Sequence, residues 1–417
     1  MSPGGWQLTR LRYLAQLSPV VRTAGLDPDS EVTFVPLECV WPGDRLDTTR
    51  TRRLDEVASG YTRFAEGDVL VPRITPTFEA RRSAVARGVR HGGPGFGTTE
   101  LHVMRPNPSL SPDFLAYRTL AHDFIESGSA AMVGVAGQRR VPPESIKDFR
   151  MALPPLEEQR RITTFLDVET AHLDGLLERK RRVLTLLNER ERAETTAAIV
   201  EVKPTHGRVP LMHLVDSERP IMYGIVLPGP HVPDGVLLVK GGNVETGRIC
   251  PELLNRTASE IELPYARSRL RAGDLLVSIR GSFGAVALVS SDLEGANITQ
   301  DAARVAPKQG VVGRWLYYAL RSAHAYSQMA ARATGATIRG VNVRDLKRIK
   351  LPVPASQGQK QLAGRLDRAS QATAAIRSRL EEQLRVLNER RQVLITAAVT
   401  GELDPSSYSR PRRLEAA

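Results

Sequence analysis

The chain repeats itself at a spacing of about 200 residues, with small changes of offset between the matching segments. Residues 184–199 read LTLLNERERAETTAAI and residues 384–399 read LRVLNERRQVLITAAV, with the tripeptide Asn-Glu-Arg in the same place in both. Further matches occur in the same order upstream: 66–74 parallels 272–280, 96–106 parallels 297–307, and 153–167 parallels 351–367. Ordered matches of this kind indicate a tandem duplication of one folding unit.

Each copy ends in a long segment that is predicted to be helical. The first lies between Pro155 and Pro204, and the second opens at Ser356 and closes at Gly401, residues typical of helix boundaries. Apolar residues recur every three or four positions through both segments, as in coiled coils. We expect the two helices to pair with each other as an antiparallel coiled coil. The alternative is two separate surface helices, each packed on its own domain.

The segments before the helices contain short apolar runs separated by glycine- and proline-rich turns, which predict strands. Short helices are expected near 113–126 and 312–331. The predicted fold class is α+β, with two similar α/β domains in tandem and a long helix after each. The expected division is a first domain at 1–155, a central helix at 156–203, a second domain at 204–355, a C-terminal helix at 356–402 and a tail at 403–417.

The charge of the chain points to a polyanionic partner. The formal net charge is +12, which favours nucleic acid first and an anionic membrane second. No apolar run approaches the roughly 18 residues needed to span a bilayer, and the N-terminus lacks the apolar stretch of a secretory signal. The cysteines are Cys39 and Cys250, one in each half, which suits a reducing compartment. We therefore expect a cytoplasmic protein without membrane association.

Motifs of common catalytic classes are missing from the sequence. There is no GxxxxGK[ST] phosphate loop, no zinc-binding spacing and no Asn-Pro-Pro-aromatic tetrapeptide of amino-methyltransferases. Acidic-x-Lys triplets at 178–180 and 345–347 could suggest a nuclease. The first lies in the coiled-coil stretch, and the second loses its acid in the matching triplet at 145–147. The sequence thus predicts a binding protein rather than an enzyme.

Several segments resemble the target-recognition domains and helix starts of type I restriction–modification specificity subunits. They are GDVLVPRITPTFE (67–79), GFGTTELHVMRP (95–106) and AGQRRVPPESIKDFRMALPPLEEQRRI (136–162) in the first half, and GDLLVSIRGSFGAVALV (273–289), ANITQDAARV (296–305) and LPVPASQGQKQL (351–362) in the second. The most specific piece is Leu-Pro-Pro-Leu-Glu-Glu-Gln at 153–159. The second copy departs from it with Ala-Ser-Gln-Gly-Gln at 355–359, which keeps helix capping but lacks the acidic pair.

The resemblance implies that each domain reads one half of a split double-stranded DNA site, with the paired helices as a ruler for the spacer. It also implies two modification (methyltransferase) subunits, which hold S-adenosylmethionine, and possible restriction subunits, which use ATP and Mg²⁺. This chain itself is then expected to hold no cofactor or metal. The expected partner-binding residues are those at the start of the first helix: Leu156, Glu157, Glu158 and Gln159.

Cationic and amide side chains in the loops are the candidate DNA contacts. Lys and Arg neutralise phosphates, whereas Arg pairs with guanine and Asn or Gln with adenine. In the first domain the predicted residues are Arg73, Thr75, Arg90, Thr98, Thr99, Gln138 and Arg139. In the second they are Lys240, Asn243, Arg280, Ser282, Asn297, Gln300 and Arg339. Arg139 and Arg339 occupy matching positions in the repeat.

Two other classes of function stay open at this point. A coiled-coil scaffold whose domains bind proteins would show no salt-dependent DNA binding. A nuclease with an unrecognised site would cleave DNA as the purified chain with metal alone. Within the family, an orphan or silent specificity gene is a third alternative.

Overall fold

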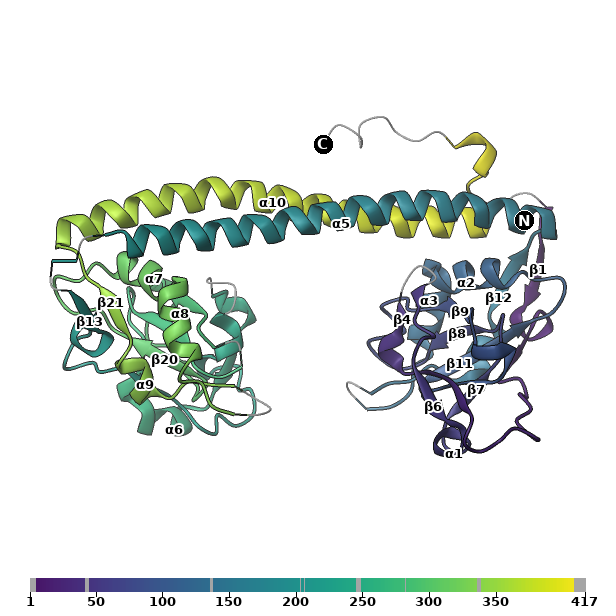
Figure 1. Ribbon diagram of the computed structural model, residues 1–417, viewed down its shortest axis with the longest axis horizontal. Coiled ribbons are helices and arrows are strands. Elements are labelled where there is room, and N and C mark those ends of the chain that lie inside the picture. The colour runs from purple at the N-terminus through teal and green to yellow at the C-terminus, as the bar shows by residue number, and fades with distance from the viewer. Residues whose placement is uncertain are drawn as a thin grey trace. The chain divides into compact units, whose positions relative to one another are not determined.

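The computed structural model describes residues 5–41, 45–135, 138–202, 204–205, 207–244, 249–281, 283–335 and 339–408, apart from the side chain of His91. The chain forms two compact units: unit 1 comprises 1–181 with 382–417, and unit 2 comprises 182–381. There are two 45-residue helices, α5 (Leu156–Val200) and α10 (Ser356–Thr400) (Figure 1). One part of each helix belongs to unit 1 and the other part to unit 2. The predicted division treated each long helix as a separate segment. In the structure the boundary between the two compact units falls near the middle of each long helix.

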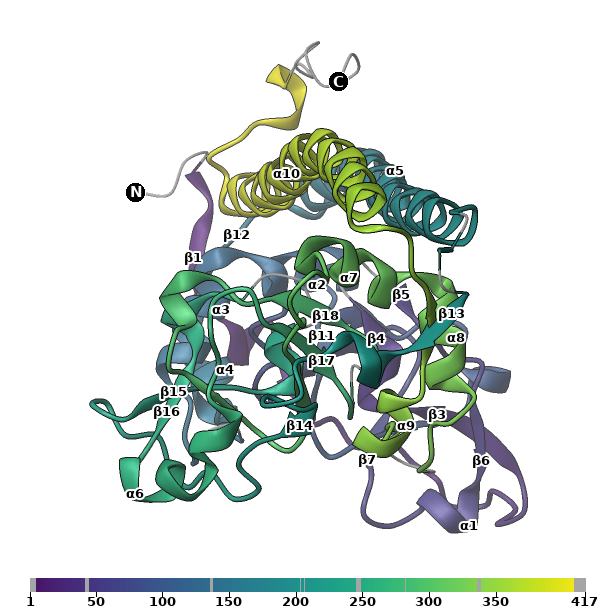
Figure 2. The same cartoon turned by 90° about the vertical axis from the view of Figure 1, so that its left-hand side faces the viewer.

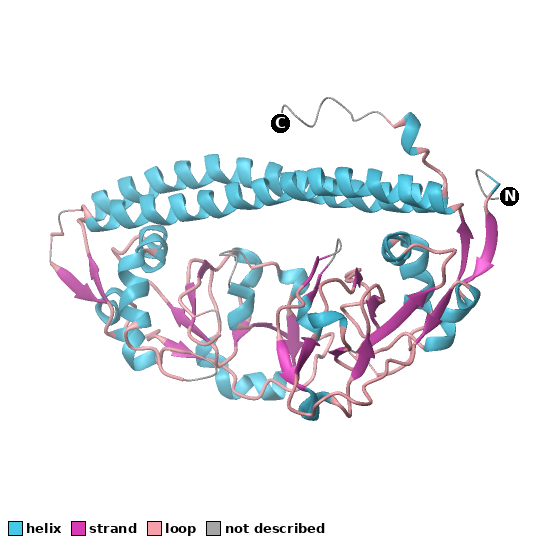
Figure 3. Cartoon of the chain, turned by 45° about the vertical axis from the view of Figure 1, so that its right-hand side comes forward, coloured by secondary structure: helices cyan, strands magenta, loops and turns pink. Residues whose placement is uncertain are grey.

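Unit 1 is built on sheets of short strands joined by long loops (Figure 3). In one sheet β3 and β10 are parallel and the other neighbours antiparallel; its order is β6 (Thr51–Arg53), β3 (Glu31–Val35), β10 (Gly95–Gly97), β7 (Thr62–Phe64). A second, antiparallel sheet has the order β2 (Ala15–Leu17), β11 (Leu101–Pro106), β8 (Val69–Pro72), β9 (Ala84–Val85). Two ribbons complete the unit: β1 (Gln7–Arg10) with β12 (Arg150–Leu153), and β4 (Val40–Trp41) with β5 (Arg45–Leu46).

The helices of unit 1 are short and pack on different sheets. They are α1 (Leu54–Val57), α2 (Pro112–Leu120), α3 (His122–Ala130) and α4 (Pro143–Asp148). Figure 1 shows α2 between the strands and the long helices, and its Phe114 is buried in the same core cluster as Leu166 of α5. The helix predicted near 113–126 is two helices, because Ala121 has an extended backbone with ψ 152°.

Unit 2 repeats this plan. Its antiparallel sheet has the order β14 (Met222–Tyr223), β20 (Ala302–Val305), β17 (Leu275–Ser278), β18 (Val286–Leu288). The other strands form β16 (Asn255–Thr257), β15 (Val236–Val239), β19 (Asn297–Ile298), and the ribbon of β13 (Arg208–Pro210) with β21 (Lys350–Pro352). The helices are α6 (Ser259–Glu262), α7 (Gly313–Arg321), α8 (Ala323–Ala330) and α9 (Val343–Lys347), with α7 beneath the long helices (Figure 2). The helix expected near 312–331 is likewise broken, at the extended Ser322.

The long helices pack together in antiparallel fashion within each unit. In unit 1, Lys180 bonds Gln383 at 2.8 Å and Asp174 bonds Arg391 at 3.1 Å, so rising numbers in α5 meet falling numbers in α10. Apolar side chains along the seam, including Leu166, Leu173, Leu387 and Leu394, are buried. Full burial of each such side chain stabilises the pair by about 2 kcal/mol. This confirms the predicted pairing of two helices. Within the described residues, no helix is both long and apolar enough to cross a membrane.

Equivalent contacts fix each domain to the helices. The side-chain oxygen of Gln159 accepts a bond from Ser111 N at 2.7 Å, just before α2. In unit 2, Gln359 accepts one from Val312 N at 2.8 Å, just before α7. In both units the tyrosine six residues after this N–H group donates its hydroxyl to an aspartate of the following long helix at 2.7 Å: Tyr117 to Asp167 and Tyr318 to Asp367. The repeat is therefore structural as well as sequential.

Candidate nucleic-acid interface

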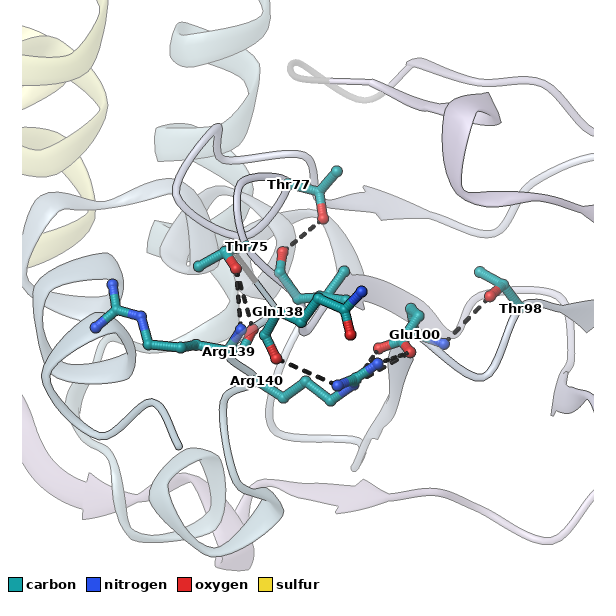
Figure 4. Close-up of polar contacts among 8 residues, drawn as sticks. Thr75, Thr77, Thr98, Glu100, Gln138, Arg139 and Arg140 are labelled. Atoms are coloured by element: carbon teal, nitrogen blue, oxygen red, sulfur yellow. Dashed lines mark hydrogen bonds and ion pairs between the residues drawn. The ribbon is translucent and has the colours of Figure 1, made fainter. Parts of the chain in front are cut away.

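The structure brings several of the predicted residues of unit 1 into one loop cluster (Figure 4). The loop after β8 bonds to the segment before α4: Thr75 N donates to Arg139 O at 2.9 Å, and Arg139 N donates to the Thr75 hydroxyl at 3.1 Å. Ile74 and Arg140 form an isolated antiparallel bridge at the same place. Segments more than 60 residues apart in sequence therefore carry Arg73, Thr75, Gln138 and Arg139 together.

Part of the positive charge of this cluster is neutralised by a carboxylate of the same unit. The guanidinium of Arg140 holds the carboxylate of Glu100 through bonds of 2.7 and 2.9 Å, and these bonds lower the pKa of Glu100. Arg140 therefore has a protein partner, whereas Gln138 and Arg139 are exposed. Among the described residues, the ion pair of Arg139 is a long one, 3.8 Å from Glu79. A long, exposed ion pair of this kind stabilises little and is easily exchanged for a phosphate. Arg139 and Gln138 are thus the polar groups available to a ligand.

Arg73 and the threonines frame this cluster. Arg73 is half-buried, and its Nε has no hydrogen-bond partner within the described residues. The hydroxyl of Thr98 accepts a bond from Glu100 N at 3.3 Å, and Thr99 is exposed beside it. Arg90 lies elsewhere, at the other end of β10, where its N–H bonds Thr33 and its guanidinium lies 3.4 Å from Glu31. The structure therefore does not bring Arg90 into the loop cluster.

Unit 2 contains the equivalent cluster, but Gly340 stands where unit 1 has Arg140, and Arg280 stands on the facing segment where unit 1 has Ile74. Gly340 bridges both Arg280 and Thr334, as Arg140 bridges Ile74 and Val133 in unit 1. A Cβ on Gly340 would lie 3.0 Å from Cγ of Arg280, so glycine here makes room for the Arg280 stem. Arg280 and Arg339 are exposed, and no carboxylate within the described residues pairs with either. The predicted Ser282 lies outside the described residues.

Lys240 and Gln300 lie next to this cluster. The backbone at Gly241 approaches Asp301 so closely that a Cβ would meet the Asp301 carbonyl at 2.8 Å, and that carbonyl also accepts a bond from Ile279 N. Lys240 is exposed, and Gln300 makes one long bond of 3.5 Å to Val226 O. The oxygen of Asn243 accepts from Lys240 N at 2.8 Å and so closes its own turn.

Asn297 corrects the prediction, because it is fully buried with its hydrogen-bonding capacity filled. Its amide donates to Glu262 at 2.8 Å and to Tyr265 O at 3.0 Å, while its oxygen accepts from Ser268 and from Ile298 N. An asparagine side chain has two donors and two lone pairs, so nothing remains for a base. Asn297 holds the α6 region against β19.

The four residues at the start of α5 have different environments. Leu156 and Glu157 are exposed, and Glu157 bonds Arg160 one turn along the helix at 2.8 Å. Glu158 is half-buried and accepts a bond from the Trp6 indole at 3.2 Å. Gln159 is fully buried, and its amide bonds Ser111 N, Ser109 O and Pro154 O, so it serves the fold rather than a partner. A glutamine recurs at the matching position of the repeat, where Gln359 bonds Pro354 O in the same way. This recurrence was the signal of a structural role that the sequence contained.

The clusters present cations and amides to solvent. The described residues hold no group of three or more His, Cys, Asp or Glu side chains placed to bind a metal ion. His102, beside the cluster, is buried. Burial, opposed by the bond to Val141 O and assisted by the charge of Arg73, lowers the pKa of His102 to about 4. A neutral, buried imidazole and paired carboxylates leave cations and amides as the groups presented at the surface.

Comparison with known proteins finds similarity to type I restriction specificity subunits. Residues 256–386 match the family model described as Type I restriction modification DNA specificity domain. The chain is 28% identical over 311 residues to the type I restriction enzyme EcoEI specificity subunit of Escherichia coli, covering 66% of this chain and 51% of that protein. It is 35% identical over 162 residues to the EcoAI specificity subunit of the same organism, covering 38% and 27%. The chain thus spans about half the length, or less, of these relatives.

A solved structure shares the fold along nearly the whole chain. It is described as the structural basis of complex assembly and conformational transition of the type I R-M system. The TM-score is 0.63 at 20% identity, covering 97% of this chain and 100% of that one. At this identity the likeness concerns the fold.

Proposed function

We propose that this chain, which belongs to the type I restriction–modification DNA specificity family, reads a bipartite double-stranded DNA site with one half-site for each unit. The observation that carries the proposal is the repeated loop cluster. Both copies have the same bridged backbone, but the exposed groups differ: Gln138 and Arg139 in unit 1, Lys240, Arg280 and Arg339 in unit 2. A common frame with unlike readers suits two unlike half-sites.

Physical chemistry assigns these groups complementary tasks. An exposed arginine or lysine that lacks a carboxylate partner binds a backbone phosphate or the O6 and N7 edge of guanine, and an exposed glutamine suits adenine. Two modest readers on one chain also gain affinity, because the second binds at the effective concentration set by the first. The helices are the element that sets the spacing of the readers and hence the length of the unread spacer.

The chemistry of modification belongs to partners in this proposal. Two methyltransferase subunits holding S-adenosylmethionine dock on the chain, and two restriction subunits that use ATP and Mg²⁺ can join them, in the cytoplasm. The exposed Leu156 and Glu157 are the contact points that we propose on α5. The chain holds no cofactor of its own and performs no catalysis.

The test is co-expression of the chain with its modification subunit, followed by genome-wide mapping of methylated bases. Arg139→Ala is expected to relax or change one half of the methylated motif, and Arg339→Ala the other half. Arg385→Ala, on an exposed face of α10 where the arginine pairs with Glu382 and Glu389, is the matched control. Loss of one base contact costs about 1–3 kcal/mol of discrimination.

Other outcomes would favour the other classes of function. A methylated motif unchanged by both variants contradicts the assignment of these residues. A purified complex that binds duplexes without sequence preference overturns the function itself and favours a scaffold, and DNA cleavage by the chain with metal alone favours a nuclease.

The role of the long helices in setting the spacer is tested separately by inserting one helical turn into α5 and the matching turn into α10. The motif is expected to keep both halves and lengthen its spacer.

A further inference from the structure

Unit 2 contains an arginine-lined cavity that is separate from its loop cluster. Its volume is about 490 Å³, and its wall is formed by the segments 218–222 and 266–271 with Arg304 of β20. Arg304 lies opposite Leu276 in the sheet, whereas Arg280 follows the other end of β17. The cavity is therefore not part of the surface assigned above to base reading.

Arg304 is the most deeply buried of the arginines that line this cavity. The residue is 1% exposed, yet its partners in the described ranges are carbonyls: Nη1 donates to Arg267 O at 2.6 Å and to Arg269 O at 3.1 Å, and Nη2 donates to Pro220 O at 3.3 Å. Its Nε has no partner within the described residues. A buried charge is costly unless it is paired. Burial lowers the pKa of Arg304, although the nearby charges of Asp274 and Asp216 act in the opposite direction, and no carboxylate of the described residues bonds its guanidinium. A further anion in the cavity would therefore stabilise its charged form.

The other arginines of the cavity divide into paired and unpaired. Arg219 bonds Asp274 at 2.7 Å through both nitrogens, and Arg269 bonds Glu262 at 2.7 and 2.6 Å. Arg267 and Arg271 are exposed, and neither forms an ion pair within the described part of the chain. Glu218 and Glu294 also line the cavity, but Glu294 is engaged with Ala272 N at 2.7 Å. Arg267, Arg271 and Arg304 therefore line the cavity without a carboxylate bonded to any of them in the part of the chain that the structure describes.

A hollow in unit 1 provides the contrast. It is of similar size, about 600 Å³, and is lined by Arg50, Arg52 and Arg53. Each of these has a carboxylate partner, at 3.1 Å for Arg50 with Glu38, 3.7 Å for Arg52 with Glu56, and 2.7 Å for Arg53 with Asp55. Arginine content alone thus does not distinguish the two hollows. The difference is that Arg267, Arg271 and Arg304 of unit 2 have no bonded carboxylate within the described residues, although Glu218 and Glu294 also line that cavity. Unit 1 also has Val103 where the repeat places Arg304.

We propose that the cavity around Arg304 binds a phosphate group. Guanidinium groups pair with phosphate oxygens through two parallel bonds, and three of them converging on one hollow match a tetrahedral anion better than a planar carboxylate. The phosphate can come from the backbone of the bound duplex, in which case the site adds to the proposed DNA reading, or from a free phosphorylated molecule. The shared chemistry is the same.

The test uses the full-length chain with two probes. The first is inorganic phosphate against chloride at equal ionic strength, read as the thermal midpoint. The second is a duplex carrying the methylated motif, titrated at several salt concentrations. The variants are Arg267→Ala with Arg271→Ala, whose exposed side chains can be removed without disturbing the core, and Arg304→Gln. Arg50→Ala with Arg53→Ala in the unit 1 hollow is the matched control.

The expected result is that millimolar phosphate raises the midpoint of the wild type by about 1–2 °C, and that the cavity variants lose this rise while the control keeps it. If the phosphate belongs to the duplex backbone, the cavity variants also show a smaller salt slope of duplex binding than the wild type, by roughly 1 per lost contact. A slope unchanged in these variants identifies a free phosphate as the source. Cavity variants that match the wild type with both probes overturn the proposal. Failure of the chain to bind DNA specifically would remove the proposed function, but the phosphate arm would still decide this site.

Discussion

The hydroxyl of Thr396 accepts a hydrogen bond from the backbone N–H of His122, 3.0 Å away and 274 residues earlier in the chain. His122 is the first residue of α3, and its N–H group is one that a helix cannot satisfy internally. In unit 2, Thr196 accepts from Ala323, the first residue of α8, at 2.9 Å. Each domain is therefore capped by the long helix that belongs to the other half of the repeat.

The two caps are expected to differ in strength. Residue Ala121 gives α3 no side-chain cap of its own, whereas Ser322 caps α8 by accepting from Ala325 N. Thr396→Val is therefore expected to cost about 1 kcal/mol of unfolding free energy and Thr196→Val clearly less. Chemical denaturation measures both. Thr400→Val, which removes only bonds to carbonyls of its own helix, is the control, and equal losses for Thr196 and Thr396 would contradict the capping account.

Gln159 is expected to act on stability rather than on assembly. Replacement by Leu leaves Ser111 N and two carbonyls without their buried partner, which costs about 2–4 kcal/mol. The loss should appear in denaturation of the chain alone. Glu157→Ala, at an exposed position two residues before, should leave stability unchanged but weaken binding of the modification subunit. A Gln159→Leu chain of normal stability that no longer binds this subunit would restore the original prediction of a partner contact.

Charges across the helix seam are expected to select the correct pairing. Asp174 of α5 pairs with Arg391 in unit 1, and Glu191 of α5 pairs with Arg377 at 2.8 Å in unit 2. Positions 191 and 391 match in the repeat but carry opposite charges. Two α5 helices in this register would set Asp174 against Glu191, and two α10 helices Arg377 against Arg391. Like charges in these places disfavour self-pairing between chains.

A charge swap tests this pairing. Arg391→Asp alone is expected to cost about 2 kcal/mol, because the arginine side chain is 11% exposed and faces Asp174. The double change Asp174→Arg with Arg391→Asp should recover most of that loss. Thermal denaturation and the oligomeric state in solution are the measurements. Additive losses in the double variant would show that the pair does not act as a unit.

His102 is expected to make the chain sensitive to mild acid. Burial lowers its pKa to about 4 in the folded chain, whereas the unfolded chain takes up this proton near pH 6.5. Because the unfolded state binds more protons between these values, stability is complete above about pH 6.5 and falls by about 3 kcal/mol as the pH drops to 4. His102→Gln should flatten this slope, and exposed His213→Gln should not. Equal slopes in all three chains would rule His102 out as the cause.

The sequence alone determined the features that local physics decides. The repeat, the two proline-free helices and their apolar stripe follow from residue periodicity and helix-end signals, and they led directly to tandem domains on an antiparallel pair. The positions of exposed cations in the loops, such as Arg139 and Arg339, also followed from the repeat.

Only the tertiary structure decided which polar groups are free. Asn297 and Gln159 look like surface amides in sequence, but Glu262, Tyr265 and Ser111, which lie 32 to 48 residues away, fill their hydrogen bonds. In the same way, Glu100 neutralises Arg140 and leaves its neighbour Arg139 available. Burial and pairing are properties of distant segments brought together, and no local pattern of residues records them.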